Sequence, residues 1–347
     1  MHFDIDDLNS RIIKLQGLMN STLNDIEKLE LSRDIKLLKL MVNYVSNDRY
    51  YVESMDLPFT EQMDKRNNEL VNFFNKNSKL LYRSLYGYSF GMKLPWKFTL
   101  DKKISNCDYE KLLIDFLSVF DTRLLDIYEF LKESKRIEIN PKKYNIFSDA
   151  LGLNVHLITS DESFILSRFN NKMSRASIIP HELGHAFIHN KTNNIDSFVR
   201  KNGSLFSEAY SIFLEMIFYD YLKNTIYFKN ARSSEYNKLD SFLGISECFN
   251  SIILSFDKLT TRDGKIYLDD SSVADIYSST LVFSNLLAMY LVNLYRNDKC
   301  KFMIKINEFF DMFGYASDEE ILSYFKLEDM IYGTNSVLNE YIKTYRK

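Results

Sequence analysis

The sequence predicts a mainly α-helical protein that is long enough for one large domain or two ordinary ones. Only 10 of its 347 residues are glycine and 4 are proline, whereas a fold of short strands needs a turn signal roughly every 8 to 12 residues. Hydrophobic residues make up 46% and charged residues 26%, which is typical of a globular chain. The aromatic content, 27 Phe and 23 Tyr, excludes a disordered one.

Apolar residues recur at helical spacing along most of the chain. They predict a helical pair within residues 4–57 and further helices at 68–88, 108–133, 175–190, 205–225, 238–256, 273–297, 302–313 and 334–345. Pro141 and Gly152 interrupt this pattern. Two β-branched or aromatic runs, 154–159 and 164–169, flank a turn-like Ser-Asp-Glu segment and predict a small β-hairpin. We therefore expect an N-terminal helical region, 1–140, and a second region, 141–347.

Charge and composition limit the partners. The 44 Lys and Arg against 47 Asp and Glu give a net charge of −3, which lacks the basic excess that nucleic-acid binding requires. Residues 276–295 carry no charge and could span a bilayer by length, but their Ser, Thr and Asn residues favour a helix buried in a large core. We expect no membrane span, and the oligomeric state stays open.

Three cysteines, Cys107, Cys248 and Cys300, are odd in number and far apart. This spacing is typical of buried free thiols in a reducing compartment rather than of a disulfide framework. The first residues are acidic where a signal peptide would be basic, and no apolar stretch follows them. We therefore expect a cytoplasmic protein.

Three of the five histidines lie in the segment Pro180-His-Glu-Leu-Gly-His-Ala-Phe-Ile-His189. On a helix, His181 and His185 sit on one face, about 6 Å apart along the axis, so both imidazoles can bind one ion. Glu182 lies on the adjoining face, where it can take a proton from water. This HExxH pattern predicts one zinc ion per chain. The alternative is that these are surface or core histidines on an ordinary amphipathic helix, but the pattern should arise by chance in well under roughly one in a hundred such chains.

The helix itself does not complete the site. His189 lies one more turn along the same stripe, but a straight helix cannot wrap three successive turns around one tetrahedral ion. We therefore expect His189 to cap the helix or to support a ligand. A metzincin would carry Gly at position 188 and His at 191, whereas Ile188 and Lys191 stand there. Because catalytic zinc sites use three protein ligands plus water, the third ligand must come from elsewhere.

A downstream carboxylate is the remaining candidate. Asp196, Glu208, Glu215 and Asp220 follow the motif, and the chain is expected to reverse in the polar loop at residues 191–203. Glu208, in the first turns of the returning helix, would come back level with the histidines and is the favoured ligand. Glu215 lies two turns further along, about 10 Å on the axis, so it would support a ligand or serve as a buried hydrogen-bonding carboxylate.

Residues 173–216 resemble the zinc oligopeptidases of the thimet oligopeptidase and oligoendopeptidase F family, in a shortened form. The matching segments are His181-Glu-Leu-Gly-His185, a preceding strand, Glu208-Ala-Tyr-Ser-Ile-Phe-Leu-Glu215 and, less specifically, the tail Phe313-Gly-Tyr-Ala-Ser-Asp-Glu-Glu-Ile-Leu322. The resemblance implies a multi-helical gluzincin fold with a small sheet beside the zinc helix. It also implies that His181, His185 and Glu208 bind zinc and that Glu182 is the general base.

These features together predict a zinc metallopeptidase that hydrolyses oligopeptides, in which Glu182 accepts a proton from the attacking water and returns it to the leaving amine. The strand at 164–169 would hold the substrate backbone by edge pairing. Two alternatives stay open. One is a processing peptidase dedicated to one peptide or leader, and the other is a non-catalytic zinc-containing peptide-binding protein, against which the intact Glu182 argues.

The resemblance leaves the oxyanion donor to be found. The family holds the substrate oxyanion with a histidine and tyrosines, but no histidine follows His189 in this chain. Tyr277, at the start of the uncharged helix, is the best positional match, because a phenol donates a strong hydrogen bond and stays neutral at pH 7.

Tyr277→Phe should lower peptide turnover at least about tenfold with little change in zinc content, because it removes only the donor to the developing negative charge. Turnover number and metal content measured on the same preparation check this prediction. A Tyr277 hydroxyl buried in the core away from the metal would contradict it and direct the search to other tyrosines.

Overall fold

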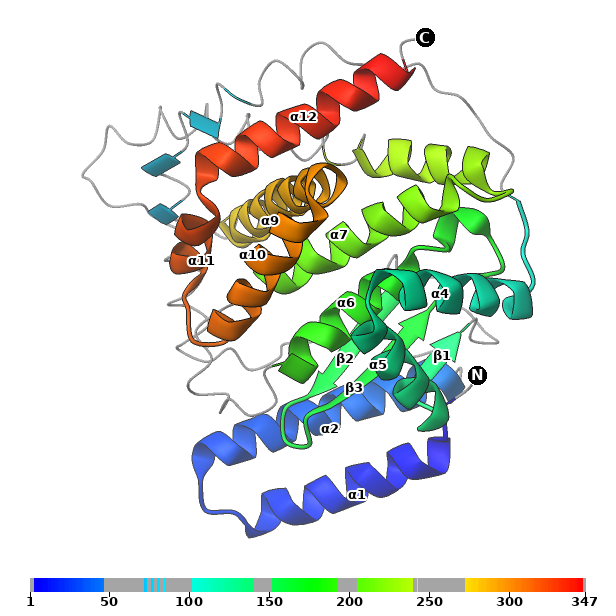
Figure 1. The fold of residues 1–347 in the computed structure, drawn as a ribbon. Coiled ribbons are helices and arrows are strands. Elements are labelled where there is room, and N and C mark those ends of the chain that lie inside the picture. Colours follow the sequence, from blue (N-terminus) through cyan, green and yellow to red (C-terminus); the bar gives the residue numbers. More distant parts are fainter. Residues whose placement is uncertain are drawn as a thin grey trace. The chain divides into compact units, whose positions relative to one another are not determined.

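The computed structural model of the chain describes residues 3–46, 102–139, 152–191, 205–239 and 272–345, together with residue 242 and a few positions within 72–84. These residues are mainly α-helical, with one three-stranded sheet among them (Figure 1). They divide into two compact units, Met1–Thr60 with Asp101–Ser197, and Glu61–Leu100 with Phe198–Lys347. The predicted fold class is confirmed. The division of the chain at residues 140 and 141 stays a prediction.

The sheet of the first unit contains the predicted hairpin. Strands β2 (Gly152–Leu157) and β3 (Glu162–Ser167) pair antiparallel, and each begins two residues earlier than predicted. A third strand, β1 (Ile137–Ile139), pairs parallel with β3, so the order is β1-β3-β2. The sequence analysis missed β1, because three residues are too few to show an alternating pattern.

One face of the sheet packs against two helices, α1 (Ile5–Ser21) and α2 (Asp25–Ser46). Helix α1 begins where the Asp4 side chain accepts a hydrogen bond from the Asp7 backbone N–H. The buried residues of α1 and α2 form one hydrophobic cluster with four residues of the sheet, Val155, Leu157, Phe164 and Leu166. The predicted helical pair is thus confirmed up to residue 46, and its remainder lies outside the described residues.

A buried carboxylate ties the hairpin to α2. Asp34 accepts hydrogen bonds from the backbone N–H groups of Ile158 (3.2 Å) and Thr159 (2.8 Å) and from the Thr159 hydroxyl (2.6 Å). Burial raises the pKa of Asp34 although these hydrogen bonds lower it. Because these donors lie where β2 leads into the turn of the hairpin, Asp34 fixes the position of that turn on α2.

A second anchor lies at the start of β3. The Glu162 carboxylate is paired with the guanidinium groups of Arg11 from α1 and Arg136, which precedes β1. Both guanidinium groups also lie over the Phe164 ring, at 5.8 and 5.6 Å from its centroid. One carboxylate and one ring therefore join α1, β1 and β3.

The other face of the sheet packs against α6 (Ile178–Lys191), which carries the HExxH motif. The residue positions alternate along β2, so Gly152 and His156 face α6 while Val155 faces α1 and α2. The expected arrangement of a small sheet beside the histidine helix is confirmed.

The single helix predicted just before the sheet is in fact two helices. The pattern over residues 108–133 folds as α4 (Asn106–Phe120) and α5 (Thr122–Glu133). Asp121 breaks it, because its extended backbone (φ −159°, ψ 110°) ends α4 and its side chain caps α5 by accepting from the Arg123 N–H.

Helix α4 also supports the approach to α6. The buried Tyr109 hydroxyl donates to the Ala176 carbonyl oxygen at 2.6 Å, two residues before α6 begins. The Tyr109 ring stacks on Phe169 with a centroid distance of 4.1 Å. The chain that enters the histidine helix is therefore held by a hydrogen bond and a ring contact.

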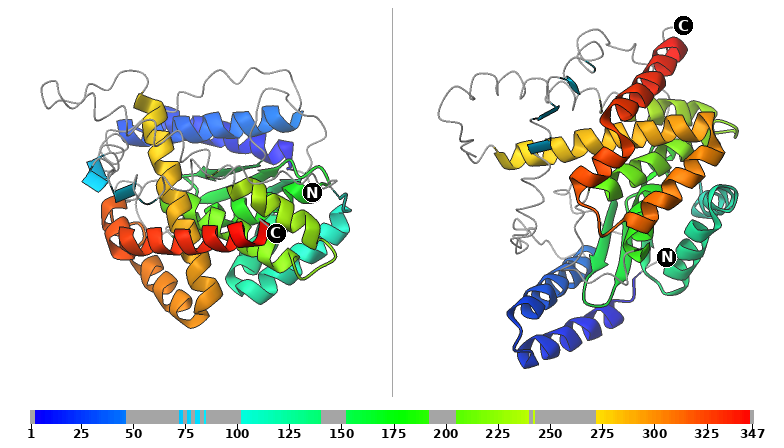
Figure 2. Two further views of the ribbon diagram at one scale, coloured as in Figure 1. Left: turned by 90° about the horizontal axis from the view of Figure 1, so that it is seen from above. Right: turned by 60° about the vertical axis from the view of Figure 1, so that its left-hand side comes forward.

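The second unit is helical in its described part. Its elements are α7 (Leu205–Leu222), α9 (Ser272–Asn297), α10 (Lys299–Met312), α11 (Asp318–Phe325) and α12 (Leu327–Tyr345). Helix α9 packs against both α7 and α12 (Figure 2). Residues 282–292 of α9 are buried, as expected for a core helix. Among the described residues, no helix combines the length and the apolar composition that crossing a membrane requires.

In this unit the bounds of several helices differ from the predicted ones. The helices at 205–225, 273–297 and 302–313 are confirmed as α7, α9 and α10. The predicted helix at 334–345 begins earlier, as α12, and α11 precedes it with a capping box between Ser317 and Glu320. Residues 228–239 are helical, ahead of the helix predicted at 238–256. Most of that helix, and most of the one at 68–88, lies outside the described residues.

The thiol prediction is corrected in one respect. Cys107 and Cys300 are free, as expected, but both are exposed rather than buried, because each lies in the first turn of a helix with its side chain at the surface. Cys248 lies outside the described residues.

An ionic network joins α7, residues 228–239 and α9. The Arg296 guanidinium binds both oxygens of Asp220 at 2.8 Å and one oxygen of Glu235 at 3.1 Å, and Lys223 contacts the same two carboxylates. Burial would raise the pKa of Asp220, but its hydrogen bonds from Arg296 and Lys223 hold that pKa below its usual value. Burial raises the pKa of Glu235 to about 7. Arg296 also reaches Glu340, which is exposed.

Arg296→Met should lower the free energy of unfolding by about 3 kcal/mol, because it leaves the buried Glu235 and the half-buried Asp220 with Lys223 as their one remaining shared cation among the described residues. Glu340→Ala is the matched control and should cost less than about 1 kcal/mol, because this partner is exposed. Urea unfolding of both variants checks the prediction. Equal small losses would show that the network does not stabilise the fold.

Candidate metal centre

The two histidines of the motif are brought together on α6. The Nε2 atoms of His181 and His185 lie 3.2 Å apart, and their rings meet edge to face with centroids 4.9 Å apart. Both side chains are half-buried. The i, i+4 spacing produces this meeting, because residues four apart are neighbours on one helix face.

This separation fits a shared metal ion. Two nitrogens bound to one tetrahedral zinc at 2.0–2.1 Å lie about 3.3 Å apart, close to the 3.2 Å between the two Nε2 atoms. Imidazole nitrogens are also zinc's preferred nitrogen ligands. The donor set and its spacing therefore suit zinc.

Glu182 points to the sheet rather than to solvent. Its side chain is 5% exposed, and its carboxylate lies beside the first residue of β2, Gly152, where a β-carbon would come within 2.4 Å of Oε1. The rotation of about 100° from His181 to Glu182 separates the face of α6 that carries the two imidazoles from the face that packs on the sheet. Glu182 is thus buried but adjacent in sequence to an accessible histidine.

Glu208 stands in the first turn of α7. That end of α7 is fixed by a large buried ring, Phe206, which packs on Phe309, Phe313 and Phe325. It is fixed also by Ser284 of α9, whose hydroxyl donates to the Leu205 carbonyl at 2.9 Å.

Among the described residues, His181 and His185 of the first unit and Glu208 of the second offer ligand types that could hold a metal ion, and each side chain is half-buried. A pair of imidazoles and a carboxylate is a ligand set used by catalytic zinc sites.

The other carboxylate of α7 has different partners. Glu215 is buried and accepts hydrogen bonds from Lys238 Nζ at 3.0 Å and from the Tyr219 hydroxyl at 3.5 Å. Of the two roles open to it from sequence, these contacts favour that of a buried hydrogen-bonding carboxylate.

His189 lies on the face of α6 that meets the sheet and not, as the sequence analysis placed it, on the stripe of His181 and His185, because seven residues bring it nearly in line with Glu182. Its ring stacks on His156 of β2 with a centroid distance of 4.2 Å and an interplanar angle of 5°. His156 in turn contacts Ser163 of β3, with 3.2 Å between Nδ1 and Oγ. This contact gives His189 a packing role at the C-terminal end of the helix, which the sequence analysis did not identify.

The prediction that the strand at residues 164–169 pairs with the substrate is wrong. Residues 162–167 form β3, which lies in the middle of the described sheet with β1 on one side and β2 on the other. Both of its edges are occupied there, so it has no edge to offer a peptide. The error arose because β1 was not predicted.

Tyr277 lies in α9, but its side chain is outside the described part of the structure, so its role stays a prediction.

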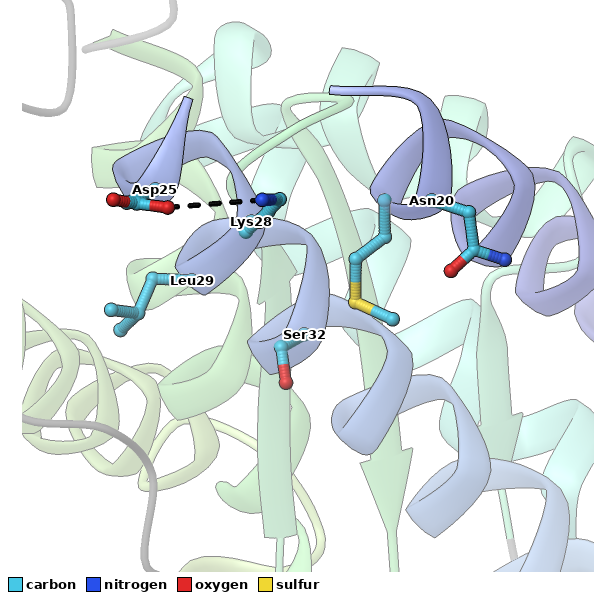
Figure 3. Close-up of a pocket in the computed structure, with 6 residues that line it drawn as sticks. Asn20, Asp25, Lys28, Leu29 and Ser32 are labelled. Carbon is cyan, nitrogen blue, oxygen red and sulfur yellow. Dashed lines mark ion pairs between the residues drawn. The ribbon is translucent and has the colours of Figure 1, made fainter. Parts of the chain in front are cut away.

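A shallow hollow between the ends of α1 and α2 is lined by Met19, Asn20, Asp25, Lys28, Leu29 and Ser32 (Figure 3). Asp25 and Lys28, both on α2, form an exposed ion pair there, and none of the candidate catalytic residues lines the hollow.

Comparison with solved structures identifies the fold. The chain is similar to a "putative oligoendopeptidase F" from Bacillus anthracis, with 13% identity, 91% of this chain and 62% of that chain covered and a TM-score of 0.53. It is similar to a "putative peptidase" from Chlamydophila abortus, with 15% identity, 90% and 61% covered and a TM-score of 0.50. It is also similar to PZ peptidase A crystallised with an inhibitor, with 12% identity, 96% and 71% covered and a TM-score of 0.50.

These comparisons establish a likeness of fold to peptidases. The chain spans less than two thirds of the length of the first two structures, 62% and 61%. No protein-family model matches the sequence. No curated protein matches it either.

Proposed function

We propose that this protein is a zinc-dependent metallopeptidase that hydrolyses peptide bonds of oligopeptides. The observation that carries the proposal is the 3.2 Å separation of the His181 and His185 Nε2 atoms, which suits two nitrogens on one zinc ion. The likeness of fold to structures named as peptidases supports it.

Three residues would hold the metal. His181 and His185 would supply two neutral imidazole nitrogens, and Glu208 would supply a carboxylate oxygen, a donor set that catalytic zinc sites use. When bound, zinc supplies Lewis acidity that polarises a carbonyl and makes water a better nucleophile at neutral pH.

Glu182 would move the proton. Its carboxylate accepts a proton from the water that attacks the peptide carbonyl, and then gives it to the departing amine nitrogen as the C–N bond breaks. Burial of the Glu182 side chain keeps bulk water away from this carboxylate, and its contact with β2 limits its rotation. The same residue can serve both steps because it starts as a base and ends the first step as an acid.

The edge of β2 that faces away from β3, with which no described strand pairs, would align the substrate. The Ile165 N–H donates to the Arg136 carbonyl on the β1 side, so Ile165 and its partner Asn154 form a non-hydrogen-bonded pair of the β2-β3 ladder. The backbone N–H and C=O groups of Asn154 and Gly152 therefore point away from β3. An extended peptide that pairs there would pass beside Glu182, which lies against Gly152.

One zinc ion per chain should be bound, and Glu208→Ala should lose it, because two imidazoles alone leave a catalytic zinc site one protein ligand short. Glu215→Ala is the matched control on the same helix and should keep one zinc ion, because its carboxylate is engaged by Lys238. Metal analysis after dialysis checks both variants. Full zinc in Glu208→Ala, with loss in Glu215→Ala, would reverse the ligand assignment.

Glu182→Gln should keep the fold and the zinc but lower peptide turnover by about 10² to 10⁴-fold, because an amide cannot accept the proton of water. Turnover of a peptide mixture, followed by mass spectrometry, measures this loss. Chelation followed by return of zinc should abolish and restore wild-type activity. Comparable turnover by variant and wild type would exclude Glu182 as the general base, whereas no turnover by zinc-loaded wild type would favour a non-catalytic peptide-binding protein.

A further inference from the structure

Gly152 occupies a position where no other residue fits without moving Glu182. A β-carbon built on Gly152 would lie 2.4 Å from Glu182 Oε1, 3.1 Å from Glu182 Cδ and 2.6 Å from Ile178 Cγ2. Carbon and oxygen atoms that are not bonded do not approach to 2.4 Å, so one of them must shift. The displaced atoms are the ends of side chains, and the backbone of α6 is not among them.

Backbone conformation does not explain this glycine. Gly314 is the glycine with a positive φ in the described residues, and Gly152 is not. Gly152 is instead the first residue of β2, paired with Ser167. A strand favours residues with side chains, because glycine there loses more backbone entropy and packs nothing. The absence of a side chain is therefore what this position requires.

The two contacts identify what the glycine makes room for. Ile178 and Glu182 are one turn apart on α6 and both face Gly152. Ile178 is apolar and could turn within the core, whereas the Glu182 carboxylate would have to leave its place against the strand. The position of that carboxylate decides whether it can reach the proton of the attacking water.

We propose that Gly152 is a positioning residue for Glu182: the missing side chain lets the carboxylate lie against β2, at the point where the general base is needed. This inference rests on the proposed peptidase function. A methyl group there would displace the carboxylate by roughly 1 Å, and a misplacement of that size in a catalytic group can lower the rate about 10²-fold.

Gly152→Ala tests the proposal. We expect it to keep one zinc ion per chain and to change KM less than threefold, while lowering kcat about 100-fold, because Glu182 moves a proton and does not bind substrate. Two controls bracket the substitution. Gly17→Ala adds a methyl group with nothing within 4 Å, and Gly333→Ala adds one against the Tyr290 backbone at 3.0 Å. Both should keep the wild-type kcat, although the second should destabilise the fold.

A second measurement does not depend on activity. In a double-mutant cycle, Gly152→Ala should lower the folded-to-unfolded equilibrium constant at least about threefold more in the wild type than in Glu182→Ala, where the carboxylate is gone. If Gly152→Ala does not fold, the same cycle is measured with Ile178→Ala in every protein, which removes the second close contact.

The outcomes separate the two proposals. Equal destabilisation in both backgrounds, or a kcat within threefold of the wild type in Gly152→Ala, would overturn the positioning role. If the wild type with zinc cleaves no peptide, the proposed function fails. The stability cycle then still decides whether the methyl group and the Glu182 carboxylate compete for one space.

Discussion

The helical repeat of α6 is the constraint on which the candidate site depends. Four residues make about one turn, so the imidazoles of His181 and His185 meet with 3.2 Å between their Nε2 atoms. One residue on from His181 the helix has rotated by about 100°, and Glu182 consequently packs against the sheet. Two turns beyond Glu182, His189 meets His156. On a single helix, rotation alone therefore separates the two imidazoles from the side chains that contact the strand.

The position of α6 depends on contacts that reach through the rest of the first unit. The sheet that faces α6 is itself held from its other face, where Asp34 binds the hairpin turn and Arg11 binds the start of β3. Tyr109 holds the chain two residues before α6 starts. Because Glu182 contacts a strand rather than a loop, its position depends on this whole arrangement. The proposed role of Glu182 as general base would gain precision from such support.

The sequence was sufficient for the features that local spacing encodes. The HExxH helix, the hairpin and the amphipathic pair at the N-terminus follow from periodicity, and the structure bears them out. What it could not provide depends on contacts between distant residues. Strand β1 is too short to show a pattern, and missing it led to the wrong substrate strand. Asp121 ends one helix and caps the next, which the apolar pattern does not show. In the sequence, Gly152 indicated only an interruption of the helical pattern, whereas in the structure it leaves room for the Glu182 side chain. The side chain of Tyr277 lies outside the described residues.

The anchoring of the hairpin on α2 has a consequence for folding order. Asp34 bonds to Thr159, which is 125 residues later in the chain, and Phe3 bonds to Glu138 across 135 residues. At synthesis rates of about 5–20 residues per second, an interval of 125 residues lasts roughly 6–25 s. During that interval the apolar faces of α1 and α2 lack the sheet that later covers them. We therefore expect chaperone binding to nascent chains of this protein to peak before β3 is synthesised.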